Sequence, residues 1–274
     1  MTTPRDELRA LLARLRFHGM ARTLDAELDR VEREASPAPE LIHRLLSAEA
    51  AYRRERSLAY RLDQARLPWP WTLQTFPFAR QPGVNKAQIR TLAGLDFVRR
   101  AENVLLIGDT GTGKTGLGIG LLREACLNGY NARFYKAQAL LDELYASLAD
   151  RSTSKLLKRL SRFQPLLIDE LSYLVLKPEQ TNAFFRLMDE RYNRTSTIIT
   201  TNLPCENWYD LFQNKSLVDA LLSRLKHHCI TIHIKGPSLR TPEPAPPPTP
   251  PSETATKPST RRTASPKQPP TPSR

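Results

Sequence analysis

Cysteine is scarce in this chain of 274 residues, which contains only Cys126, Cys205 and Cys229. No two of them form a CxxC pair, so a disulfide framework is not expected and a reducing compartment fits the composition best. Long apolar runs are also missing: no stretch approaches the roughly 18 residues of a membrane span, and the first residues lack the apolar core of a signal peptide. We therefore expect a cytoplasmic protein with no membrane partner.

Acidic side chains are few relative to basic ones. The chain has 41 lysines and arginines against 28 aspartates and glutamates, which gives a formal net charge of +13. Residues 67–240 hold 23 of the basic and 15 of the acidic side chains, so most of the excess lies there. A charge this positive indicates a polyanionic partner: DNA, RNA, a nucleotide or an anionic membrane surface.

Composition divides the chain into four segments. Residues 1–66 have helical periodicity, residues 67–84 form a linker rich in proline and aromatic side chains, and residues 85–240 alternate between helix and strand patterns. Residues 241–274 hold 12 of the 23 prolines. Because proline at this density prevents helices and inner strands, the last segment is predicted to be a disordered basic tail.

The N-terminal segment is predicted to be an all-α module. Two apolar stripes at helical spacing support this, formed by Leu8, Leu11, Leu12 and Leu15 and by Leu41, Ile42, Leu45 and Leu46. Every basic residue in this segment is arginine, mixed with acidic residues. The pattern suits both a docking module for a protein or DNA partner and a pair of helices with a solvated charged surface.

Five short apolar runs in residues 85–240 predict strands. They cover 103–107, 132–135, 165–168, 196–200 and 229–234. His227, His228, Cys229 and His233 invite a metal interpretation, but half of a zinc site is missing and the alternation in 229–234 favours a strand. Helical patterns between the runs predict an α/β domain, with a parallel sheet covered by helices on both faces.

Residues 108–115 match the whole phosphate-loop pattern GxxxxGK[ST], directly after a predicted strand and before a predicted helix. The backbone N–H groups of such a loop and the positive end of the helix dipole surround phosphate groups. Lys114 is expected to reach the β- and γ-phosphates, and the Thr115 hydroxyl to bind Mg²⁺. The predicted nucleotide-binding residues are Gly108, Asp109, Thr110, Gly111, Thr112, Gly113, Lys114 and Thr115.

Two carboxylates follow the apolar run 165–168. Asp169 is predicted to bind Mg²⁺ directly or through water, and Glu170 to polarise the water that attacks the γ-phosphate. Asn202 ends the next strand, where it can lie beside Asp169 and hold that water. A strand-end turn is the alternative interpretation of Asn202.

Basic side chains at two further places are candidates for contacts with phosphates. Arg224, on a predicted helix before the last strand, is a candidate to stabilise charge on a γ-phosphate, often that of a neighbouring subunit; an ordinary surface arginine is the alternative. Between residues 151 and 162 no acidic residue occurs and leucines alternate with basic residues, which predicts a basic amphipathic helix. Its candidate DNA contacts, or simply its solvated charges, are Arg151, Lys155, Lys158, Arg159 and Arg162.

Taken in order, these motifs resemble the IstB-type ATP-binding proteins of insertion sequences, relatives of the DnaC helicase loader within the AAA+ ATPases. The resemblance covers about residues 8–240. Besides the phosphate loop, it rests on the segments LRFHGMA (15–21), NKAQI (85–89), ENVLLI (102–107), IDELSYL (168–174), RY (191–192), TTNLP (200–204) with Trp208, SRLKHH (223–228) and KGPSLR (235–240).

The resemblance implies a function. Such proteins assemble on duplex DNA with ATP and Mg²⁺, work beside a cognate transposase, and hydrolyse ATP to reset the assembly. It also implies that Arg224 is an arginine finger across a homo-oligomer interface and that Arg240 contacts nucleotide phosphates. Three positions depart from the usual family pattern: Gly116 stands where histidine is usual, Ser223 where aspartate is, and Leu239 where tyrosine is.

Three other functions share part of the motif set. A loader of a replicative helicase would carry every motif above and differ in preferring single-stranded DNA. A metabolic phosphoryl-transfer enzyme would need an acceptor site, of which the sequence has no signature. A degenerate nucleotide-binding structural protein is disfavoured because Lys114, Asp169 and Glu170 are all present.

Overall fold

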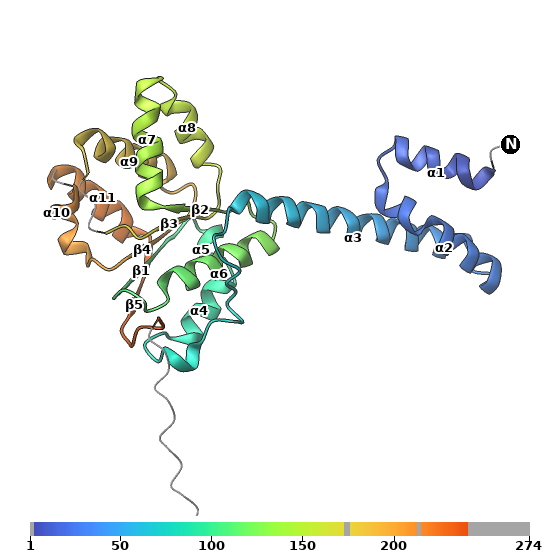
Figure 1. Cartoon of the computed structure of the whole chain (residues 1–274), viewed down its shortest axis with the longest axis horizontal. Helices are drawn as coiled ribbons and strands as arrows, with labels where there is room; N and C mark the ends of the chain where they lie inside the picture. Colours follow the sequence, from blue (N-terminus) through green and yellow to red (C-terminus); the bar gives the residue numbers. More distant parts are fainter. Residues whose placement is uncertain (1–2, 173–175, 213–214, 241–274) are drawn as a thin grey trace, which may run out of the picture. The chain divides into compact units, whose positions relative to one another are not determined.

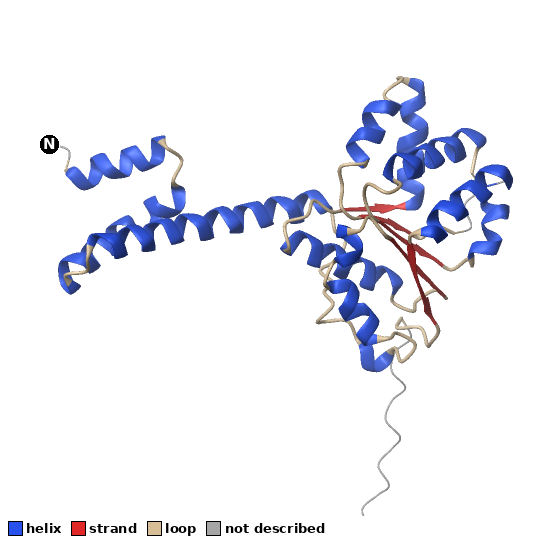
Figure 2. Ribbon diagram, turned by 180° about the vertical axis from the view of Figure 1, so that it is seen from behind, coloured by secondary structure: helices blue, strands red, loops and turns tan. Residues whose placement is uncertain are grey.

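Five parallel strands form one sheet, in the order β2-β3-β4-β1-β5. In this computed structural model each strand lies within one residue of its predicted range, and the α/β class is confirmed (Figures 1 and 2). The strands are β1 (Asn103–Gly108), β2 (Arg133–Lys136), β3 (Leu166–Asp169), β4 (Thr197–Thr201) and β5 (Cys229–Ile234). Because all five run in parallel, their carboxyl ends meet at one edge of the sheet.

Helices cover both faces of the sheet, as predicted (Figure 1). Side chains alternate along a strand, so Leu105 packs with one helical layer whereas Leu106 packs with the other. One layer contains α4 (Lys86–Ala93), α5 (Asp96–Arg99) and α6 (Lys114–Leu127). The opposite layer contains α7 (Ala137–Ala149), α8 (Thr153–Leu160), α9 (Pro178–Arg191), α10 (Trp208–Phe212) and α11 (Lys215–His227).

The structure describes residues 3–172, 176–212 and 215–240. The predicted disordered tail therefore lies outside the described residues. Two short 3-10 helices, η1 (Phe78–Arg80) and η2 (Cys205–Asn207), complete the elements. Among the helices in the described ranges, none is both long and apolar enough to cross a membrane.

The N-terminal segment folds as α1 (Pro4–Arg14), α2 (His18–Glu34) and α3 (Ala38–Ala65), with a small core around Leu12, Leu24 and Leu45. The stripe predicted on the first helix is only partly buried, since Leu12 is covered while Leu15 is 53% exposed. The reason is geometric: α1 packs mainly on α2, and one neighbour cannot cover a whole apolar stripe. The same holds on α3, where Leu45 is buried but Leu46 is exposed.

A buried carboxylate fixes the start of α2 against α3. Glu49 accepts hydrogen bonds from the backbone N–H groups of Gly19 (2.6 Å) and Met20 (3.2 Å) and from Arg53 (2.7 Å). Burial raises the pKa of Glu49, but the Arg53 hydrogen bond and the two backbone hydrogen bonds together lower that pKa below its ordinary value. The carboxylate thus caps α2 at its positive end, where negative charge is favourable.

Arg191, at the end of α9, joins α8 to the sheet. Its guanidinium donates to Thr197 Oγ1 (2.9 Å) and to the carbonyls of Leu160 (2.7 Å), Phe163 (3.1 Å) and Ser196. Complete burial lowers the pKa of Arg191 to about 9, which leaves the group charged at neutral pH. The carbonyls at the end of α8 and the start of β4 thus share one buried cation.

Replacing Arg191 with methionine is expected to lower the free energy of unfolding by about 3 kcal/mol, because each buried carbonyl left unpaired costs about 1–3 kcal/mol. Urea denaturation followed by circular dichroism would measure the change. The matched control is Arg194→Met, because Arg194 lies on the surface, where its guanidinium is 3.5 Å from the Glu190 carboxylate. Equal stability of the two variants would contradict the assignment.

Candidate functional site

The predicted phosphate loop connects β1 to α6 at the carboxyl edge of the sheet. Gly113, the residue before α6, has a φ of +92°, in the left-handed region that favours glycine. Thr112 is buried and donates its hydroxyl to the Asp109 carbonyl at 2.8 Å. The loop therefore ends at a helix N-terminus, where the unpaired backbone N–H groups of the first turn can bind an anion.

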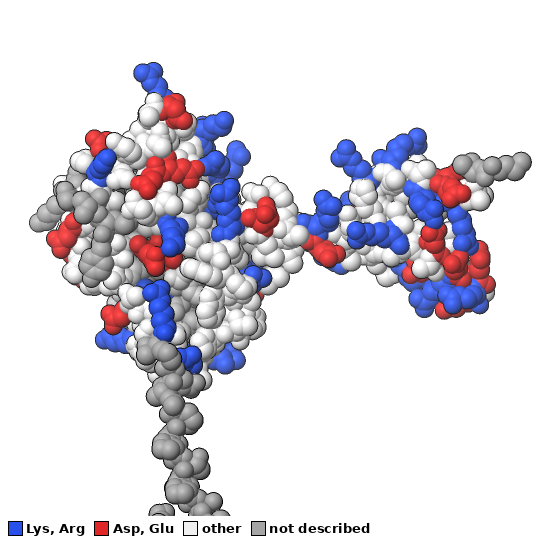
Figure 3. Space-filling model, in the orientation of Figure 1, with Lys and Arg blue, Asp and Glu red and all other residues white. Residues whose placement is uncertain are grey.

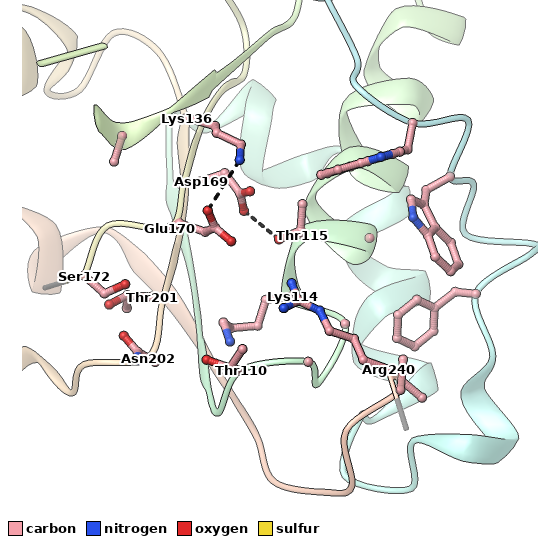
Figure 4. Close-up of a pocket in the computed structure, with 18 of the residues that line it drawn as sticks. Thr110, Lys114, Thr115, Lys136, Asp169, Glu170, Ser172, Thr201, Asn202 and Arg240 are labelled. Atoms are coloured by element: carbon pink, nitrogen blue, oxygen red, sulfur yellow. Dashed lines mark hydrogen bonds and ion pairs between the residues drawn. The ribbon is translucent and has the colours of Figure 1, made fainter. Parts of the chain in front are cut away.

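Lys114 lies across the mouth of this loop (Figure 4). Its ammonium donates to the carbonyls of Gly108 (2.6 Å) and Asp109 (2.7 Å). Burial lowers the pKa of Lys114, and the negative charge of Asp169 opposes that shift. The loop therefore holds a desolvated cation beside the helix N-terminus, in position to attract phosphate oxygens.

Asp169 is buried at the end of β3 and joins two strands to the phosphate loop. Its Oδ1 accepts hydrogen bonds from Thr115 Oγ1 (2.9 Å) and Thr200 Oγ1 (2.6 Å). Burial raises the pKa of Asp169, while the hydrogen bonds from Thr200 and Thr115 lower it and the charge of Glu170 adds to the rise. Figure 4 shows the Thr115 contact as a dashed line. Threonine hydroxyl and carboxylate oxygens together form a donor set that suits Mg²⁺.

Thr200 is a site residue that the sequence interpretation missed. It lies at the carboxyl end of β4, and the parallel register pairs Ile168 with Ile199, which brings Asp169 beside Thr200. The backbone N–H of Glu170 donates to the same hydroxyl, Thr200 Oγ1, at 2.9 Å. The hydroxyl therefore connects the two acidic residues. The only sequence signal for it was the polar run that follows the apolar part of β4.

Glu170 points from the strand end into the cavity, whereas Asp169 is buried (Figure 4). Its backbone has a φ of +59°, a region that costs a non-glycine residue energy and occurs often at functional sites. Its carboxylate lies 3.8 Å from the Lys136 ammonium at the end of β2, and both side chains are 56% exposed. Lys136 is a second residue at the site that the sequence did not indicate.

Asn202 also lines the cavity, on the side of Thr201 and Ser172 (Figure 4). Its Oδ1 atom is buried and accepts no hydrogen bond within the described part of the chain. A buried amide oxygen without a donor is costly, which makes Asn202 a candidate to bind a polar group.

The cavity has a volume of about 630 Å³, within the range of small-molecule sites. The carboxylates, the phosphate loop and Arg240 line it, together with the aromatic side chains of Trp69, Trp71 and Phe76. Of these linker aromatics Phe76 is buried, whereas the two tryptophans are partly exposed.

Residues 235–240 run across the phosphate loop and place Arg240 at the cavity. The Leu239 N–H donates to the Gly111 carbonyl at 2.9 Å. The buried Gln81 side chain donates from Nε2 to the Thr112 carbonyl (3.1 Å) and the Pro237 carbonyl (3.0 Å). Gln81 therefore ties the linker, the loop and this C-terminal segment together. The sequence interpretation did not single it out, because nothing in its neighbours marks it.

Arg224 is the one candidate catalytic residue that does not line this cavity. It lies exposed on α11, where it forms an ion pair with Asp189 at 3.1 Å and stacks over the Tyr192 ring at 6.0 Å. Within a single chain Arg224 is therefore not at the phosphate loop. Any contact with a γ-phosphate would have to be made to another subunit.

The basic stretch 151–162 folds as predicted, with α8 at its centre. Leu156, Leu157 and Leu160 are buried, and the basic side chains project outward. Exposed basic residues gather on this part of the surface (Figure 3). Among the five candidate DNA contacts, Arg159 forms an ion pair with Glu143 on α7. Arg151 and Arg162 flank the helix, and the exposed candidates are Arg151, Lys155, Lys158, Arg159 and Arg162.

Comparison with known proteins identifies relatives of this arrangement. The family model of the IstB-like ATP binding protein matches residues 10–244. The insertion sequence IS21 putative ATP-binding protein of Pseudomonas aeruginosa is 37% identical over 237 residues, 86% of this chain and 89% of that protein. The IS5376 putative ATP-binding protein of Geobacillus stearothermophilus is 35% identical over 201 residues, 73% of this chain and 80% of that protein.

Solved structures share the fold of the domain. The DnaC helicase loader has a TM-score of 0.54 with 24% identity, over 62% of this chain and all of that one. AMPPCP-bound DnaA from Aquifex aeolicus has a TM-score of 0.52 with 19% identity, over 62% of this chain and 51% of that one. The sheet and its flanking helices thus share their fold with domains of the DnaC helicase loader and of DnaA. The family model covers most of the chain, so this chain belongs to the IstB-like ATP binding protein family.

Proposed function

We propose that the chain is an ATP-dependent regulator of transposition, which assembles on duplex target DNA, cooperates with a transposase and hydrolyses ATP to reset the assembly. The observation that carries the nucleotide part is the network of Thr115, Asp169, Thr200 and Glu170 beside the phosphate loop. It combines a phosphate-binding loop with oxygen donors for a cation and an exposed carboxylate. The family and its relatives in insertion sequences support the transposition part.

In this proposal the loop amides and Lys114 bind the β- and γ-phosphates of ATP. Thr115 and Asp169 would hold Mg²⁺, which when bound neutralises phosphate charge. Thr200 keeps the Asp169 carboxylate oriented toward Thr115 through its own hydrogen bond. Arg240, held near Lys114 by the segment across the loop, adds a second positive side chain to the phosphates (Figure 4).

Hydrolysis would follow from the positions of Glu170 and Asn202. Asn202 Oδ1 holds a water molecule by accepting one of its hydrogens, and Glu170 takes the other proton as the water oxygen bonds to the γ-phosphorus. The bond between that phosphorus and the β–γ bridging oxygen breaks, and ADP and phosphate leave. Lys136, whose ammonium lies 3.8 Å from the Glu170 carboxylate, adds a positive side chain on this side of the cavity.

Assembly would couple this site to a second subunit. Arg224 is exposed and lies outside its own cavity, so it is available to reach the γ-phosphate bound by a neighbour. A γ-phosphate held from both sides favours the assembled state, and its loss on hydrolysis removes that preference. The free energy of ATP is then used for assembly and release.

Strand preference and nucleotide dependence test the proposal. Purified protein would be titrated onto random duplex and single-stranded DNA with ATP, ADP or no nucleotide, at one fixed moderate salt concentration because phosphate contacts depend on salt. We expect cooperative binding to duplex DNA that requires ATP. A preference for single strands would instead favour a helicase loader. Binding to neither in any nucleotide state would reject both functions and direct the search to a small-molecule acceptor.

Removing charge from α8 is expected to weaken duplex binding. The double variant Lys155→Ala, Lys158→Ala should lower the affinity about 10-fold at moderate salt and reduce the slope of log K against log salt by about 2, one unit for each lost phosphate contact. Fluorescence anisotropy with labelled duplex measures both quantities. The control is Arg99→Ala, Arg100→Ala, which removes the same charge from the opposite helical layer. Equal slopes for the two variants would show that α8 is a solvated face.

A further inference from the structure

The start of α6 lies under two aromatic side chains of the linker, Trp71 and Phe76, which we call the aromatic wall. A methyl group built on Gly116 would lie 3.5 Å from the Trp71 ring and 3.7 Å from the Phe76 ring. The two ring centroids are 6.4 Å apart. A methyl group at position 116 would thus be in ordinary contact with both rings. The two linker aromatics therefore pack directly over the start of α6.

The aromatic wall and the carboxylates lie on different sides of the same helix start. Consecutive residues of a helix point about 100° apart. Thr115 is hydrogen-bonded to Asp169 at the sheet, and Gly116 contacts the linker. Thr115, Asp169, Gly116 and both residues of the aromatic wall line the same cavity of about 630 Å³. A triphosphate bound along the loop with its γ end at Asp169 and Glu170 therefore has its nucleoside end on the side of the aromatic wall.

The aromatic wall is fixed in place but keeps an accessible face. Phe76 is 4% exposed and packs edge-on against Phe78 at 4.8 Å, whereas Trp71 is 36% exposed. The buried Gln81 ties the same linker to the phosphate loop. A partly exposed indole held by a buried neighbour is a suitable surface for a planar ring, because little side-chain freedom remains to be lost on binding.

We propose that Trp71, supported by Phe76, stacks on the base of the bound nucleoside triphosphate, and that this stacking makes the site prefer purine over pyrimidine nucleotides. The proposal rests on the nucleotide site proposed above. An aromatic face stacks on every base without a hydrogen-bond code, and the larger purine ring system gives the larger contact area. ATP and GTP are therefore expected to bind with similar affinity, and CTP and UTP about 10-fold more weakly.

Calorimetry and tryptophan fluorescence on the full chain test the stacking. Trp71→Ala should weaken ATP binding about 10- to 100-fold, and Trp71→Phe should retain affinity within about 3-fold because a π face remains. Trp71→Leu should behave like the alanine variant. ATP should quench the emission of the wild-type protein, and Trp71→Phe should lose most of that quench, because Trp208 is buried in the core. Trp69 also lines the cavity, so Trp69→Phe is measured beside it and should retain most of the quench.

Inorganic tripolyphosphate separates this proposal from the one on which it rests. It should bind the wild type and Trp71→Ala equally, since both keep the phosphate loop. If neither ATP nor tripolyphosphate binds the wild type, the nucleotide site itself is wrong. If both bind and Trp71→Ala binds ATP as the wild type does, the stacking is wrong. If leucine restores affinity as well as phenylalanine does, Trp71 acts only by filling space and the stacking is again wrong.

Discussion

Replacing Lys114 with alanine is expected to abolish ATP binding, with a loss of affinity of more than about 100-fold, or roughly 3 kcal/mol. The lysine is the cation that the loop carbonyls of Gly108 and Asp109 hold at the helix N-terminus. Because the ammonium is partly buried, which also lowers its pKa, its attraction to phosphate oxygens is stronger than in water. Isothermal titration calorimetry with ATP and Mg²⁺ measures the change.

Lys155→Ala is the matched control for Lys114→Ala. It removes the same charge from the exposed face of α8, outside the cavity, and should leave ATP affinity within about 2-fold because surface charges are screened at moderate salt. A Lys114→Ala variant that binds ATP as well as this control would show that the loop is not the phosphate site.

The variant Glu170→Gln is expected to keep ATP affinity while its hydrolysis rate falls at least about 100-fold, the usual contribution of a positioned general base. Glutamine retains the shape of the side chain but cannot take a proton from water. The backbone hydrogen bond from Glu170 to Thr200 does not involve the carboxylate, so the network around Asp169 should remain. Phosphate release at saturating Mg-ATP measures the rate, and DNA complexes formed with ATP should persist longer than those of the wild type.

Glu179→Gln provides the comparison for Glu170→Gln. Glu179 is an exposed glutamate in the first turn of α9 and does not line the cavity, so its variant should hydrolyse ATP at the wild-type rate. Hydrolysis by Glu170→Gln at that same rate would mean that another group accepts the proton. Loss of ATP binding together with hydrolysis would mean that Glu170 holds the nucleotide or the fold of the loop and is not a base.

The two adjacent carboxylates show where sequence reasoning works. Asp169 and Glu170 were assigned different roles from their place at the end of an apolar strand. The structure places them in different surroundings: Asp169 is buried between two hydroxyls, and Glu170 reaches into the cavity from a backbone with positive φ. Glu170 follows the last residue of β3 and has a positive φ, so the alternation of side chains along the strand does not decide its direction. The hydroxyl partner Thr200, by contrast, comes from a strand 31 residues later in the chain than Asp169.

The sequence by itself determined the strands, the phosphate loop and the acidic pair, because each can be recognised from the type and order of residues in one short segment. An apolar run followed by glycines and GKT predicts a strand and a phosphate loop, and an apolar run followed by two acidic residues predicts a strand that ends in carboxylates. Neither prediction depends on the rest of the chain. Family membership followed for the same reason, since many such local segments occurred in one order.

Only the tertiary structure decided which distant residues meet at these segments. The sheet order places β4 between β3 and β1, and this brings Thr200 to Asp169. Linker packing brings Trp71 and Gln81 to the loop, and the position of α11 keeps Arg224 away from its own cavity. These contacts depend on strand order, helix placement and the space that side chains leave. The apolar stripe of α1 is a further example. The sequence predicted the stripe, but how much of it is buried depends on the neighbouring helices that pack against it.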